Sequence, residues 1–111
     1  MDKNKLLSLM GLCKKAGRLL QGIDVVTQGV LQGKVVLVLT AEDLAPRSLR
    51  RLTEALEDTG CEQIAIPVTK DDIGMKTGKM AGIVGVADAG FAKAMKKIIG
   101  SEAPGEPGAS E

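Results

Sequence analysis

Hydrophobic residues follow two spacings along this chain of 111 residues, and segments of the two kinds alternate. Spacings of three and four residues predict helices, and short apolar or β-branched runs predict strands. The pattern predicts helices over residues 3–16, 22–31, 46–59, 70–77 and 89–99, and strands over residues 19–20, 35–39, 63–68 and 83–87. Because strands alternate with helices, we expect an α/β fold in which helices cover both faces of one sheet.

Two of the expected strands differ in their surroundings. Val35–Leu39 is apolar at every position and rich in valine, which predicts a central strand that is buried on both faces. Gln63–Val68 contains Pro67, and proline within a sheet is found mainly in edge strands. We therefore expect the first strand in the middle of the sheet and the second near an edge.

The third and fourth helices carry their own start signals. Pro46 suits the first turn of a helix, and Thr69 with Asp72 three residues later favours an N-terminal cap. The third helix has a predicted inner face of leucines and a predicted outer face of arginines. These are Leu49, Leu52 and Leu56 on the inside, and Arg47, Arg50 and Arg51 on the outside.

Charge is unevenly distributed along the chain, although the net charge is only +1. Residues 100–111 carry three glutamates and no Lys or Arg, and the rest of the chain has 15 basic and 11 acidic residues. A mildly basic body permits nucleic-acid binding without requiring it. The composition predicts one folded domain over residues 1–99, followed by a disordered acidic tail of Gly, Pro and Ser over residues 100–111.

Several classes of function lack the residues that they need. The chain has no His, Trp or Tyr, and Phe91 is its only aromatic residue, so base stacking on aromatic platforms is excluded. Cys13 and Cys61 have neither a nearby base nor zinc-ligand spacing, so we expect buried, reduced thiols and no catalytic residue, metal or cofactor. No apolar run approaches the roughly 20 residues of a membrane span, and the start resembles no signal peptide, so we expect a cytoplasmic monomer.

Two acidic or glycine-rich features admit competing interpretations. Gly74–Met80 resembles a phosphate-binding loop, but its glycines are one residue too close and Met80 replaces the required Ser or Thr. Glu42, Asp43, Asp71 and Asp72 fall in loops, where they either form a magnesium site or serve as a solvated surface and helix caps. A phosphoacceptor function would use Asp43 after the main strand, although the chain begins with a helix rather than a strand.

The segment that opens the second helix is the most informative one. Gly22 places no side chain in front of the helix, and backbone N–H groups at a helix start can bind phosphates or base edges. Asp24 and Gln28 are four residues apart and share the outer face. Without further context, the segment predicts a helix start and leaves a binding function open.

The segment Gly22–Gln28 also resembles the Gly-x-Asn-Glu-x-x-Lys segment of the kink-turn-binding ribosomal proteins, the L-seven-Ae and L-thirty-e superfamily. Within that superfamily, the chain is most similar to the small bacterial YlxQ-type branch. The matching segments occur in the family's order between about residues 6 and 99. They are Ala16–Leu19, Gly22–Gln28, Lys34–Leu39, Ala41–Pro46, Ile73–Lys79 and Asp88–Ala92.

The resemblance implies a fold, a partner and a set of contacts. The fold is a three-layer α/β/α sandwich with a mixed four-stranded sheet, and the partner is a kinked RNA duplex with tandem sheared G·A pairs. Residues at the helix start would contact guanine edges, and the loop before the last strand would cover an extruded nucleotide. The contacts carried over are Gly22, Asp24, Val25 and Gln28 at the helix start, and Lys79, Met80 and Ala81 in the loop. Because Gln28 is neutral where the family has Lys, we expect the phosphate contacts to come from Arg18, Lys34, Lys76 and Lys79.

Three positions of the helix start depart from the family's segment. Asp24 replaces Asn and loses the amide donor, Val25 replaces Glu and removes an acceptor, and Gln28 replaces Lys and makes a charge-assisted contact neutral. The sequence therefore leaves two hypotheses for this surface. One is a non-catalytic, ribosome-associated RNA-binding protein, and the other is a protein-interaction or ribosome-assembly module that keeps the fold without kink-turn specificity and contacts ribosomal proteins.

Overall fold

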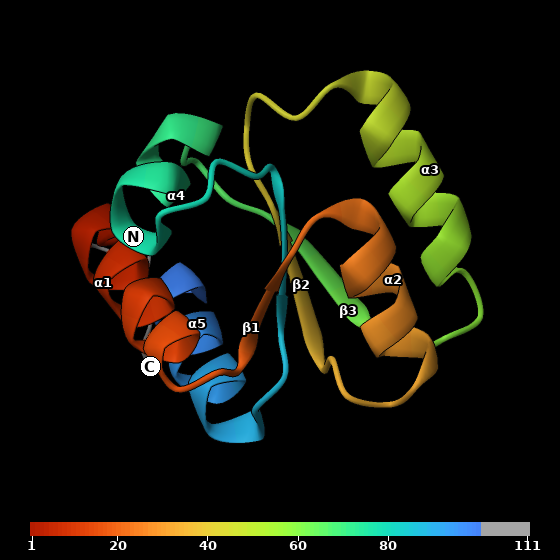
Figure 1. Ribbon diagram of the computed structural model, residues 1–111, viewed down its shortest axis with the longest axis horizontal. Helices are drawn as coiled ribbons and strands as arrows, with labels where there is room; N and C mark the ends of the chain where they lie inside the picture. The colour runs from red at the N-terminus through yellow and green to blue at the C-terminus, as the bar shows by residue number, and fades with distance from the viewer. Residues whose placement is uncertain (101–111) are drawn as a thin grey trace.

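The computed structural model describes residues 1–100, which form five helices and four strands (Figure 1). The helices are α1 (Lys3–Lys15), α2 (Ile23–Leu31), α3 (Pro46–Leu56), α4 (Lys70–Thr77) and α5 (Ala89–Gly100). The strands are β1 (Leu19–Gln21), β2 (Leu37–Thr40), β3 (Glu62–Ala65) and β4 (Ile83–Val86). The predicted alternation of helices and strands is confirmed.

The four strands form one mixed sheet in the order β1-β4-β2-β3. Strand β4 runs antiparallel to both β1 and β2, and β2 runs parallel to β3. Thr40 at the end of β2 lies opposite Ile83 at the start of β4. The start of β4, the end of β1 and the end of β2 therefore meet at one end of the sheet.

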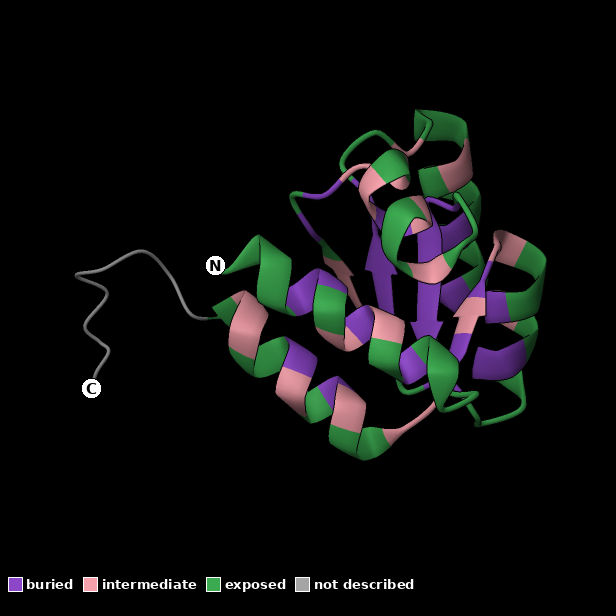
Figure 2. Cartoon of the chain, turned by 60° about the vertical axis from the view of Figure 1, so that its left-hand side comes forward, coloured by how far each residue is buried: buried purple, intermediate pink, exposed green. Residues whose placement is uncertain are grey.

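Helices cover both faces of this sheet, so the predicted α/β/α sandwich is confirmed. Helices α1, α4 and α5 lie on one face, and α2 and α3 lie on the other (Figure 1). Successive residues of β2 point to opposite faces, as the pleat of a strand requires: Leu37 and Leu39 join the core beneath α1, and Val38 joins the core beneath α2 and α3. The central strands are buried throughout (Figure 2).

Several sequence-based expectations about element limits and burial are corrected. The second strand begins at Leu37, and Val36 is 45% exposed although it donates a backbone hydrogen bond to Val86. Leu49 in α3 is exposed, because this helix buries only the narrower stripe of Leu52 and Leu56. Helix α5 continues through Gly100, and the rest of the predicted acidic tail, residues 101–111, lies outside the described residues.

Two of the four carboxylates that were expected in loops, Asp43 and Asp72, have structural partners. Asp72 accepts the Thr69 backbone N–H (3.0 Å) while the Thr69 side chain accepts the Asp72 N–H (3.1 Å), so the predicted cap of α4 is confirmed as a capping box. Asp43 accepts the backbone N–H of Lys70 at 3.0 Å. Within residues 1–100, no group of three or more His, Cys, Asp or Glu residues is arranged to hold a metal ion. None of the described helices is long and apolar enough to cross a membrane.

The two thiols are expected to react slowly in the native protein. Burial, with a smaller contribution from the charge of Asp88, raises the pKa of the Cys13 thiol to about 11, and burial and Glu62 also raise the pKa of Cys61. Because the thiolate is the reactive form, a disulfide reagent at pH 8 should modify half-buried Cys61 first and Cys13 only after unfolding in urea. Rapid modification of both thiols without denaturant would contradict this prediction.

Candidate nucleic-acid interface

Gly22 turns the chain sharply from β1 into α2. Its backbone angles, φ 112° and ψ 149°, belong to a region that side-chain-bearing residues rarely adopt. The Gly22 N–H donates to the Ile83 carbonyl (3.0 Å), and the Gly22 carbonyl accepts the Val26 N–H (3.0 Å). These two bonds fix the start of α2 beside the start of β4.

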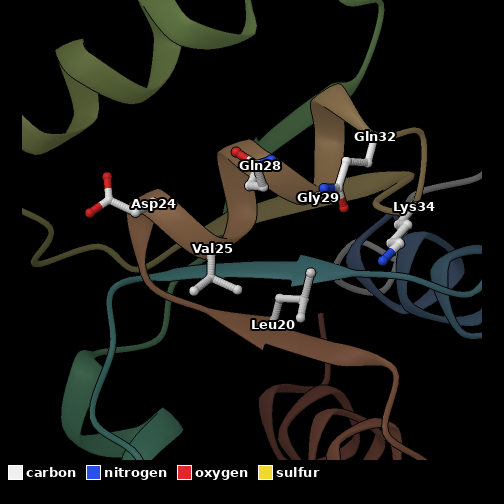
Figure 3. Close-up of a pocket in the computed structure, with 7 residues that line it drawn as sticks. All are labelled: Leu20, Asp24, Val25, Gln28, Gly29, Gln32 and Lys34. Carbon is white, nitrogen blue, oxygen red and sulfur yellow. The ribbon is translucent and has the colours of Figure 1, made fainter.

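The outer face of α2 carries the residues that the sequence predicts for binding. The Asp24 side chain is 92% exposed and Val25 is 49% exposed, and Gln28 is exposed one turn later. Figure 3 shows these side chains along a shallow groove of about 450 Å³ between α2 and β1. The groove is lined by Leu20, Asp24, Val25, Gln28, Gly29, Gln32 and Lys34.

Gly29 keeps α2 close to the sheet at the floor of this groove. A Cβ atom at this position would lie 2.6 Å from the Val35 side chain and 2.8 Å from that of Leu20. The helix can therefore pack closely against Leu20 of β1 and Val35 before β2, because residue 29 has no side chain. This close approach makes the groove shallow and leaves its outer rim, formed by Asp24 and Gln28, projecting into solvent.

The loop between α4 and β4 lies at the same end of the sheet as Gly22. Helix α4 ends at Gly78, which has a left-handed conformation (φ 84°), and the chain then passes through Lys79 and Met80. Met80 is 62% exposed and Lys79 is exposed. Ala81 is buried, so its side chain is not part of the exposed surface that the resemblance implied, and Lys79 and Met80 form the accessible part of the loop.

Gln21 joins this loop to the start of α2, a role that was not predicted from the sequence. Its buried side-chain amide donates to the Thr77 hydroxyl (2.9 Å) and to the Lys79 carbonyl (3.1 Å). Its oxygen accepts a hydrogen bond from Lys14 Nζ at 2.8 Å. Because Gln21 directly precedes Gly22, it connects the two segments that were predicted to contact RNA.

The basic residues predicted for phosphate contacts lie toward both ends of β4. The Arg18 carbonyl accepts the Ala87 N–H just beyond the strand (2.8 Å), and Val36, two residues after Lys34, donates to Val86. Arg18 and Lys34 therefore lie toward the far end of β4 from Gly22. Both are exposed, and Lys34 closes the far end of the α2 groove.

Lys79 and Lys76 lie toward the other end of β4. Lys79 belongs to the loop that precedes β4, and Lys76 is exposed in the last turn of α4. Lys14, which was not predicted, lies close to Lys79 through their shared contact with Gln21. The positive charge is therefore distributed along the length of β1 and β4, which we call the β1–β4 edge, and is not concentrated at one end.

Comparisons with known proteins find similar sequences and structures for most of this chain. No family model matches the chain. The RNA-binding protein YlxQ of Enterococcus faecium is 24% identical over 100 residues, which cover 88% of this chain and 94% of that protein. The RNA-binding protein YlxQ of Bacillus subtilis (strain 168) is 27% identical over 96 residues, which cover 82% and 91%. The chain is similar to these two YlxQ proteins over most of its length.

Solved structures give the same fold as the YlxQ-type resemblance predicts. A Bacillus halodurans C protein of unknown function superposes with a TM-score of 0.80 at 28% identity, over 87% of this chain and 98% of that one. The Giardia lamblia 15.5kD RNA binding protein superposes with a TM-score of 0.71 at 22% identity, over 87% and 83%. The second likeness is evidence for the fold alone. The similarity to the YlxQ proteins confirms the resemblance on which the site was predicted, and the solved structures support the fold that it implies.

Proposed function

We propose that this protein binds structured RNA of the kink-turn type, without catalysis, as a cytoplasmic monomer that associates with ribosomal or similar RNA. One observation carries the proposal: the start of α2 and the α4–β4 loop lie side by side at one end of the sheet. They present Asp24, Val25 and Met80 to solvent together. The names of the YlxQ relatives, which describe them as RNA-binding proteins, support the same function.

The first turn of α2 is suited to contact base edges. Gly22 provides no side-chain cap for this helix, so the N–H groups of the first turn remain available to acceptors on RNA. Asp24 can accept hydrogen bonds from guanine N–H groups beside them. Val25 contributes an apolar contact instead of a further acceptor, and Gln28 contributes neutral hydrogen bonds instead of a positive charge.

The loop and the basic edge provide the remaining contacts. Met80 is a flexible apolar side chain that can cover an unstacked base, and this role suits a chain whose only aromatic residue is Phe91. The lysines and arginine along the β1–β4 edge can neutralise phosphates, which position RNA without reading its sequence. Base selection in this proposal therefore depends mainly on Asp24.

The test of this function is a gel-shift titration at stated salt with a kink-turn duplex and with a matched duplex that lacks the G·A pairs. The wild-type protein should bind the kink-turn more tightly. Asp24→Ala should weaken kink-turn binding about tenfold, because one good base-edge contact contributes about 1–3 kcal/mol of discrimination. Equal affinity of the wild-type protein for both duplexes would contradict kink-turn recognition.

A matched variant separates the base contact from charge. Glu57→Ala removes an exposed carboxylate just after α3 and makes the protein more positive by the same amount as Asp24→Ala. General electrostatic attraction to RNA would strengthen binding in both variants. Opposite responses would support a base contact at Asp24, and equal strengthening in both would place the contact elsewhere.

A second candidate function follows from the apolar surface around the loop. Met75 and Met80 are both largely exposed and line a hollow of about 420 Å³ with Asp71, Gly74 and Gly78. Flexible methionines favour adaptable protein–protein surfaces. If the wild-type protein binds no kinked RNA and retains ribosomal proteins through this hollow, the interaction-module hypothesis replaces the first proposal.

A further inference from the structure

We propose that the outer face of α3 is a second RNA contact, where Arg47 and Arg50 bind phosphates of the RNA that occupies the α2 start. This inference rests on the proposed function. The arginines of α3 were predicted to lie outside, and none of them belongs to the α2 start, the α4–β4 loop or the basic residues predicted to bind phosphates. All three are exposed, and their spacing of three and four residues places them on one side of the helix.

Helix α3 begins at the same end of the sheet as α2. Strand β2 leads into α3, and Thr40 at its end pairs with Ile83, whose carbonyl accepts the Gly22 N–H. Arg51 in the second turn of α3 lies 3.8 Å from the Asp24 carboxylate. The arginine face therefore continues the surface that begins at Gly22.

A groove between α2 and α3 connects the start of α2 with the arginine face of α3. It has a volume of about 530 Å³ and is lined by Ile23, Asp24, Thr27, Gln28, Arg51, Glu54 and Ala55. Asp24 and Gln28 also form the rim of the groove between α2 and β1. An RNA strand that contacts these two side chains can follow either groove, and the groove toward α3 is lined by Arg51 of the arginine face.

The charges on α3 suit phosphates. Among residues 1–100, Arg47 and Arg50 form no ion pair, so their guanidinium groups are free to bind phosphate oxygens in the bidentate geometry that arginine favours. Glu54 is the only acidic residue within α3. Arg51 has a different effect, because its proximity to Asp24 offsets the repulsion between that carboxylate and an RNA backbone.

The outer face of α3 fits RNA better than an acidic protein. The cores of protein–protein interfaces are depleted of charge and enriched in aromatic residues and methionine, whereas this face presents three arginines and Glu54. Leu52 and Leu56 are buried beneath the helix, and Leu49, which is 39% exposed, is the large apolar side chain of α3 that reaches the surface. Phosphate oxygens are therefore the partner that these side chains match.

The experiment compares Arg47→Gln/Arg50→Gln with the control Lys93→Gln/Lys97→Gln, which removes two exposed charges from α5 across the sheet. Affinity is measured over a salt series for a kink-turn with long flanking helices and for the same kink-turn with trimmed helices. The α3 variant should bind the long RNA about three- to tenfold more weakly, and its log affinity–log salt slope should fall by about 1 per arginine. With the trimmed RNA, the α3 variant and the wild-type protein should bind with the same affinity and the same salt slope.

The outcomes separate the two proposals. If wild-type protein binds the kinked and unkinked duplexes equally, the proposed function fails, whatever the arginine variant does. If wild-type protein recognises the kink-turn but both double variants bind the long RNA with the same affinity and salt slope, only the α3 contact is overturned. Retention of an acidic protein by wild type and its loss from the α3 variant, with unchanged RNA binding, would assign this face to protein instead.

Discussion

Replacing Gln21 with leucine is expected to impair both the stability of the protein and its RNA binding. Leucine has a similar size but makes no hydrogen bonds, so Thr77, Lys79 and Lys14 each lose a partner in a buried or half-buried setting. We expect the free energy of unfolding in urea to fall by about 1–3 kcal/mol, because three hydrogen bonds are lost and each contributes about 0.5–1.5 kcal/mol. The loop that carries Met80 would also lose its connection to Gly22.

The loss of this connection should appear in RNA affinity as well. We expect kink-turn binding by Gln21→Leu to weaken at least about tenfold at a temperature where the variant remains folded, which corresponds to about 1.4 kcal/mol. The matched control is Gln63→Leu, which removes a hydrogen bond to Thr53 (3.2 Å) at the opposite edge of the sheet. Wild-type affinity in Gln21→Leu, despite a loss of stability, would show that Gln21 supports the fold and does not position the loop.

The structural role of Gln21 has a signal in the sequence, although a weak one. Leu19 and Gln21 are two positions apart in a strand, so they point to the same face, and Leu19 belongs to the core beneath α1. A glutamine on that face must find partners, because buried polar groups are almost always hydrogen-bonded. The partners themselves were not predictable, since Thr77 and Lys79 are 56 and 58 residues away.

Local patterns predicted most of the fold because its helices have strong local determinants. Pro46 begins α3, and the Thr69–Asp72 capping box begins α4. The exposure of Val36 and Leu49 was missed for a physical reason. An apolar residue adjacent to a strand or at the margin of a helical stripe has the same sequence signature as a buried one, and only the packing of neighbouring elements distinguishes them.

The arrangement of the binding surface depended on contacts between distant segments. Arg18 and Lys34 approach the same end of β4 because β1 and β2 both pair with this strand, on opposite edges. Arg51 reaches Asp24 because α2 and α3 pack together on one face. Spacing along the chain shows which residues share a helix face. These contacts follow instead from the strand order, which neither the residue pattern nor the resemblance specified.

Gly22→Ala is expected to have the second large effect, through backbone strain alone. A Cβ atom added at Gly22 meets no heavy atom within 4 Å, so no steric clash with a neighbour contributes. The backbone angles of Gly22 are nevertheless unfavourable for alanine, and holding a residue in such a conformation costs about 1–3 kcal/mol. We expect a loss of that size in urea unfolding, or a shifted start of α2 that relieves the strain.

Either response should move Asp24 and Val25 relative to the α4–β4 loop, so kink-turn affinity should fall about tenfold or more. Gly60→Ala is the informative control, because Gly60 also has a positive φ (75°) and open space around it but lies beyond α3. Because alanine is strained in the left-handed conformation, Gly60→Ala should lose about 1–2 kcal/mol of unfolding free energy. It should keep its RNA affinity. If both variants lose stability and neither loses affinity, the turn at Gly22 supports the fold, and the RNA contact does not depend on the direction in which α2 begins.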